Sequence, residues 1–95
     1  MPQISQKTKD RISEQILHYL YSISPEAAFT NKISAEIARD EEFTKSLLFA
    51  LKSKGLVIEI NKNPQGAQYL KRQRWRLSPQ AYSAYSKHQN HNNNL

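Results

Sequence analysis

In the first half of the chain, apolar residues recur every three or four positions, the spacing of a helix with one buried face. Residues 7–23 form the first such segment, with apolar side chains at Ile12, Ile16, Tyr19, Leu20 and Ile23. Leu17 and Tyr21 form a narrower stripe on the other side, which a later helix or a second subunit must cover. Ser24-Pro25-Glu26 is expected to end this helix.

Two more helical segments follow with few residues between them. The first carries Ile33, Ala35, Ile37 and Ala38, and capping preferences leave its start open between Thr30, Asn31 and Ser34. The second is expected to have Asp40 as its N-cap and Gly55 as its stop. Its buried face is predicted to consist of Phe43, Thr44, Leu47, Leu48 and Leu51.

After Gly55 the apolar period changes from 3.6 to 2, which predicts a β-hairpin. Its strands are residues 56–61 and 68–77, joined by the turn Asn63-Pro64-Gln65-Gly66. The return strand alternates between one face with Tyr69, Lys71, Gln73, Trp75 and Leu77 and another with Leu70, Arg72, Arg74 and Arg76. Trp75 is in phase with Leu77, so we expect it to anchor the core rather than to stack on a base.

A last helix begins at Ser78 and Pro79, which suit a cap and a first helical position. Its Tyr82 and Tyr85 are placed to cover the stripe formed by Leu17 and Tyr21. The chain end is polar and has almost nothing to bury. We therefore expect a flexible N-terminus over residues 1–6, one folded domain over residues 7–87 and a disordered polar tail over residues 88–95.

The order of these elements resembles the winged helix-turn-helix family. Three stretches carry the likeness: Ile33-Ser34-Ala35-Glu36-Ile37-Ala38-Arg39, Leu48 through Lys52-Ser53-Lys54-Gly55-Leu56-Val57, and Trp75-Arg76-Leu77-Ser78-Pro79. The resemblance to this family covers residues 8–86. The resemblance implies a mainly α fold with a small β-wing: a three-helix core, a two-stranded β-hairpin wing and a C-terminal helix. It also implies that the third helix enters the DNA major groove while the wing reaches phosphates or the minor groove.

Charge is distributed unevenly along the 95 residues. Residues 1–59 carry eight Lys/Arg against eight Asp/Glu, whereas residues 60–95 carry six Lys/Arg and no acid, so the net charge of +6 arises in the last third. Such a basic segment favours a nucleic-acid partner. The predicted DNA-binding residues are Lys45 and Ser46 on the third helix and Lys62, Lys71, Arg72, Arg74 and Arg76 on the wing.

The third helix is the weaker half of this predicted interface. Its outward face would carry Glu42, Lys45, Ser46, Phe49, Ala50 and Ser53, which include a single cation. Glu41 and Glu42 would repel phosphates, although a glutamate can accept from cytosine N4. We interpret them first as favourable charges at a helix start. Phe49 is expected to pack either in an interface or within the chain.

Catalytic and metal-binding chemistry is not indicated. The chain has no cysteine, only two glycines and no recognisable nucleophile motif. His18 lies on the outward side of the first helix, and His88 and His91 belong to the polar tail without further ligands nearby. We therefore predict neither an enzyme nor a cofactor or metal site. The lack of cysteine and of an apolar run long enough for a membrane favours a cytoplasmic protein.

The leading hypothesis is a DNA-binding transcriptional regulator that binds double-stranded DNA mainly through its basic wing. Specific binding would require a homodimer, for which Leu17, Tyr21, Tyr82 and Tyr85 are the candidate surface unless they pack on one another within one chain. The alternative is a protein-interaction module that docks through Phe49 with Phe43 and Ala50. A third hypothesis is binding of RNA or single strands by the basic strand and Tyr69.

Overall fold

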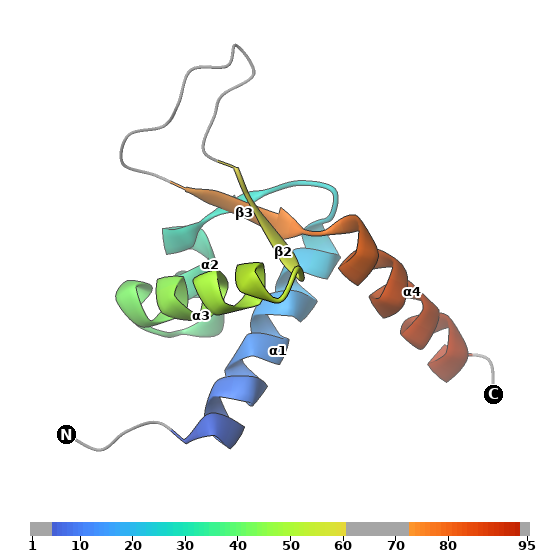
Figure 1. Cartoon of the computed structure of the whole chain (residues 1–95), viewed down its shortest axis with the longest axis horizontal. Coiled ribbons are helices and arrows are strands. Elements are labelled where there is room, and N and C mark those ends of the chain that lie inside the picture. Colours follow the sequence, from blue (N-terminus) through green and yellow to red (C-terminus); the bar gives the residue numbers. More distant parts are fainter. Residues whose placement is uncertain (1–4, 61–72, 94–95) are drawn as a thin grey trace, which may run out of the picture.

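The computed structural model describes residues 5–60 and 73–93. The elements in chain order are α1 (Gln6–Ile23), β1 (Ala28–Phe29), α2 (Thr30–Ile37), α3 (Glu41–Ser53), β2 (Val57–Ile60), β3 (Arg74–Leu77) and α4 (Pro79–Asn93). Figure 1 shows α1, α2 and α3 gathered on one side of the sheet, while α4 runs outward from the end of β3. The predicted turn at residues 63–66 and the return strand before Gln73 lie outside the described residues.

The sheet contains one strand more than the sequence predicted. β1 pairs antiparallel with β3 through Ala28–Trp75 and Phe29–Arg74, so the strand order is β1-β3-β2. The Thr30 N–H donates to the Gln73 carbonyl at 3.3 Å and extends this pairing. The prediction of a two-stranded hairpin was therefore incomplete, because a two-residue strand is too short to show a period of 2 in the sequence.

Strand register divides the sheet residues between two faces. Val57 pairs with Leu77 and Glu59 with Trp75, and these side chains share the inner face with Ala28. We call the opposite side the outer face; it carries Phe29, Ile58, Ile60, Arg74 and Arg76. The predicted alternation of residues 73–77 is confirmed by the burial of Trp75 and Leu77.

Trp75 is the largest fully buried side chain of the core. The next largest fully buried side chains come from all three N-terminal helices: Ile12, Ile16, Leu20, Ile33, Leu48 and Thr44. The Thr44 hydroxyl donates to the Asp40 carbonyl at 2.8 Å, which satisfies the polar group that α3 buries. The predicted buried faces of residues 7–23 and of α3 are thus the faces that form the core.

Helix α2 begins at Thr30 without a side-chain cap. Phe29 occupies the N-cap position and makes no side-chain cap hydrogen bond, while the Thr30 side chain makes tertiary contacts. Its hydroxyl oxygen accepts from Trp75 Nε1 at 2.8 Å, and the hydroxyl is 3.4 Å from the Gln73 carbonyl, to which it donates. Of the three predicted starts, Thr30 is the first helical residue rather than the cap.

Helices α2 and α3 end in the same way, but with different residues. Arg39 N–H bonds to Ser34 O and Ala38 N–H to Ala35 O, and likewise Leu56 N–H bonds to Leu51 O and Gly55 N–H to Lys52 O. Both patterns are Schellman motifs, in which a residue just after the end of the helix adopts a left-handed backbone conformation with a positive φ. That residue is Ala38 at φ 55° in α2 and Gly55 at φ 77° in α3. Gly55 is thus the predicted stop of α3.

Two substitutions at these positions should change stability in opposite directions. Ala38→Gly is expected to raise the free energy of unfolding by about 0.5–1 kcal/mol, because glycine adopts a positive φ without a Cβ penalty. Gly55→Ala should lower it by about 1 kcal/mol for the same reason, although an added Cβ would meet nothing within 4 Å. Urea unfolding of both variants checks the signs; equal signs would contradict the assignment.

Helix α4 continues further than expected. It reaches Asn93, whereas residues 88–95 were predicted to be a disordered tail. The residues that follow Pro79 include neither proline nor glycine up to this point. Extending an existing helix costs little once it has been nucleated, so poor helix formers such as asparagine can be added at its end. The predicted bounds of the domain and of the polar tail stay predictions.

Candidate nucleic-acid interface

Helix α3 presents a narrow exposed face formed by Glu42, Ser46, Ala50 and Ser53, which we call the α3 crest. Burial of Thr44, Leu47, Leu48 and Leu51 on the opposite side fixes this orientation. Asp40 Oδ2 accepts from the Phe43 N–H at 3.0 Å and holds the start of the helix. The Ser46 hydroxyl donates to the Phe43 carbonyl at 2.6 Å, so its oxygen faces solvent mainly as an acceptor.

Lys45 lies beside the crest rather than on it. Its side chain is half-buried and lines a polar cavity of about 270 Å³ between the starts of α2 and α3 and the start of β3. The other lining residues are Phe29, Thr30, Asn31, Glu41, Glu42 and Gln73. The position of Lys45 therefore differs from the fully outward one that the helical wheel predicted, while Ser46 is exposed as expected.

Phe49 packs within the chain. Its ring meets the Trp75 indole edge-on, with centroids 5.3 Å apart and an interplanar angle of 89°, and the Lys52 ammonium lies 5.7 Å from its centroid. It is still 40% exposed. Because aromatic pairs are stabilised in this T-shaped arrangement, Phe49 is explained by contact with the core and needs no protein partner.

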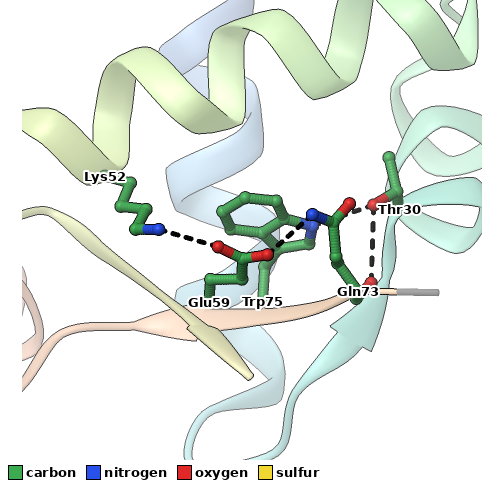
Figure 2. A network of polar contacts seen from close by, with 5 residues as sticks. All are labelled: Thr30, Lys52, Glu59, Gln73 and Trp75. Carbon is green, nitrogen blue, oxygen red and sulfur yellow. Dashed lines mark hydrogen bonds and ion pairs between the residues drawn. The ribbon is translucent and has the colours of Figure 1, made fainter. Parts of the chain in front are cut away.

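A polar network joins α3 to the inner face of the sheet (Figure 2). Glu59 accepts from Lys52 Nζ at 2.7 Å and from Gln73 Nε2 at 2.6 Å. The hydrogen bond from Lys52 lowers the pKa of the Glu59 carboxyl from its ordinary value; burial opposes this, while Gln73 and the positive charges of Lys52 and Lys45 reinforce it. Sequence reasoning missed this network, although strand alternation places Glu59 on the face of Val57.

This network should make stability depend on pH in the acidic range. Because the pKa of Glu59 is lower in the folded chain, its ionised form stabilises the fold above the unfolded pKa, and this contribution disappears as pH falls through the folded pKa. Glu59→Gln should therefore cost up to about 1 kcal/mol at pH 7 and less near pH 3. Urea unfolding at both pH values checks this; an unchanged difference would contradict it.

Arg74 and Arg76 lie on the outer face of the sheet, opposite to the side on which α3 packs. Both are half-buried, and the Arg74 guanidinium lies 5.8 Å from the centroid of the Phe29 ring. Arg76 lines a cavity of about 420 Å³ together with Ser24, Pro25, Leu77, Pro79 and Tyr82. Strand register therefore places these two arginines on the face opposite the α3 crest, although Phe29, on which Arg74 packs, also lines the cavity beside Lys45. Lys62, Tyr69, Lys71 and Arg72 lie outside the described residues.

The tyrosines of α4 cover α1, as predicted. The ring of Tyr21 lies 5.2 Å from that of Tyr82 and 5.0 Å from that of Tyr85, centroid to centroid, and Leu17 is buried. Burial raises the pKa of the Tyr85 hydroxyl. The proposed dimer residues thus pack on one another within one chain, and Tyr82 remains 43% exposed.

Within residues 5–60 and 73–93, no group of three or more His, Cys, Asp or Glu side chains could hold a metal ion. None of the helices described there is long and apolar enough to cross a membrane.

Comparison with known proteins identifies the fold. No protein-family model and no curated protein matches the chain. A solved structure of a MepR point mutant from a multidrug-resistant S. aureus clinical isolate matches with a TM-score of 0.63 and 20% identity, over 77% of this chain and 50% of that one. A second S. aureus MepR point mutant, bound to an oligodeoxyribonucleotide, matches with a TM-score of 0.57 and 20% identity, over 95% and 75%.

The chain therefore spans about half the length of the first MepR structure and three quarters of the second. At this identity the likeness establishes the architecture. The element order agrees with it: α2 and α3 joined by a tight turn, then two antiparallel strands and a final helix. The chain has the winged helix-turn-helix fold that its sequence predicted.

Proposed function

We propose that this chain is a winged-helix protein that binds double-stranded DNA and regulates transcription. One observation carries the proposal: a MepR structure whose fold matches 95% of this chain is bound to an oligodeoxyribonucleotide. The excess of Lys/Arg after residue 59 supports it, because a duplex is a dense polyanion. The alternative of docking a protein through Phe49 is not favoured, since that ring already contacts Trp75.

The α3 crest is the part suited to the major groove. Ser46, Ala50 and Ser53 are small, so the helix axis can approach the base edges closely. Lys45 lies next to the crest, and the segment between β2 and β3 contributes Lys62, Lys71 and Arg72 as phosphate contacts. Phosphate contacts supply affinity and register, whereas side chains on the crest supply sequence preference.

A single domain of this size offers few base contacts, so a useful operator would need two half-sites and a homodimer. The exposed part of Tyr82 beside the α1–α4 contact is available for such pairing. The protein would act in the cytoplasm without a cofactor.

Fluorescence anisotropy of a labelled random-sequence duplex, titrated at low and near-physiological salt, tests the proposal. We expect the duplex to bind, and the logarithm of its association constant to fall steeply with the logarithm of salt concentration. A single strand of equal length and label is the matched control, and tighter binding to it would favour single-strand recognition. No binding of the duplex at low salt would exclude the proposed function.

A further inference from the structure

We propose that Glu42 and Lys45 together read one C·G base pair, and this inference rests on the proposed function. The Glu42 carboxylate would accept from the cytosine N4 amino group, and the Lys45 ammonium would donate to O6 and N7 of the paired guanine. In a C·G pair these groups are neighbours on the floor of the major groove.

The two side chains are placed to act on the same base pair. Glu42 and Lys45 are three residues apart in the first two turns of α3, so they lie on neighbouring positions of one helix surface. Both line the polar cavity of about 270 Å³ beside the crest. Because Asp40 caps the helix through the Phe43 N–H, these first turns are held in a fixed orientation.

Both charges are available to a ligand. In the described part of the chain, Glu36 pairs with Lys32 and Glu59 with Lys52, but neither Glu42 nor Lys45 is in an ion pair. Lys52, not Lys45, is the ion-pair partner of Glu59, at 2.7 Å. Lys45 can therefore turn its ammonium to a base edge without breaking the network that holds α3 to the sheet.

The composition of α3 leaves few other ways to read sequence. The helix contains no Arg, Asn or Gln, the residues that most often read guanine and adenine. A carboxylate only accepts hydrogen bonds, so it is repelled by the acceptors of guanine and by thymine O4. It also weakens binding to phosphates nearby. Glu42 is thus suited to exclude most bases rather than to add affinity.

Selection from a randomised duplex pool tests the proposal with three proteins. The wild type should enrich C·G at one position of each half-site. Glu42→Gln should change that preference towards A·T, because a glutamine amide pairs with adenine N6 and N7. Glu14→Gln is the control: it removes an equal charge from an exposed position of α1, outside the cavity that Glu42 and Lys45 line, so it should keep the C·G preference.

Anisotropy titrations on the selected site give the magnitude. Replacing the enriched C·G pair by T·A should weaken wild-type binding about fivefold or more, within the range for one well-formed base contact. The same replacement should weaken the binding of Glu42→Gln or Lys45→Met less than it weakens that of the wild type, because each variant retains only one of the two base contacts. Lys45→Met keeps the aliphatic stem and removes only the ammonium.

Two results would overturn the inference while the proposed function stands: duplex binding without any enriched base pair, or equal C·G enrichment by Glu42→Gln and wild type. If the wild type binds no duplex, the proposed function fails as well, and the base-reading inference falls with it. The random-duplex titration distinguishes these cases, because it does not depend on sequence preference.

Discussion

Replacing Trp75 by Ala is expected to lower the free energy of unfolding by about 3–5 kcal/mol, a large part of what a domain of this size has. The side chain is fully buried and contacts α3 through the Phe49 ring and α2 through Thr30. It also lies on the central strand, with a strand on either side. Its removal therefore leaves a cavity where both helices meet the sheet.

Urea unfolding followed by far-UV circular dichroism measures this change, since the substitution removes the chain's single tryptophan as a fluorophore. Trp75→Phe separates packing from hydrogen bonding: it keeps an aromatic ring but leaves the Thr30 hydroxyl without the indole N–H. We expect a decrease in stability that is smaller than for alanine. Phe49→Ala, which removes a ring that is 40% exposed, is the control for the aromatic contact. A decrease below about 1 kcal/mol for Trp75→Ala would contradict this account of the core.

The central position of Trp75 was predictable, but its partners were not. Its burial followed from its phase with Leu77 on a strand, and α1 and α3 followed from helical periodicity and the Asp40 cap. Thr30 was identified only as a candidate cap, because capping rules consider neighbours in sequence. Its actual use, a hydrogen bond to a side chain 45 residues away, depends on the pairing of β1 with β3.

The position of the basic residues was also only partly predictable. Alternation correctly separated Arg74 and Arg76 from Trp75, yet it could not say that α3 packs on the Trp75 side. That depends on which face of a short sheet the helices cover, which is decided by the whole core. As a result, a stretch that is continuous in sequence is divided in space, with the outer-face arginines turned away from the α3 crest.

This division leads to a test of how DNA would lie on the chain. The double variant Lys62→Ala with Lys71→Ala, which changes two residues outside the alternating face of Arg74 and Arg76, should weaken duplex binding on the order of tenfold at near-physiological salt. It should also reduce the slope of log affinity against log salt by about 0.9 for each phosphate that the protein no longer neutralises. Arg74→Ala with Arg76→Ala removes the same net charge from the same part of the chain, but from the outer face of the sheet.

The comparison of the two double variants separates position from charge. Long-range attraction depends on the net charge and changes equally in both, so any further weakening in the first variant reports direct phosphate contacts. We expect the outer-face variant to keep most of the wild type's slope of log affinity against log salt. Circular dichroism must show both proteins folded, because Arg74 also packs on Phe29. If the slope fell as much in the outer-face variant as in the first, the duplex would have to reach the side of the sheet opposite α3. The α3 crest and the segment between β2 and β3 would then not contact the same stretch of DNA, and the proposed docking through α3 would be wrong.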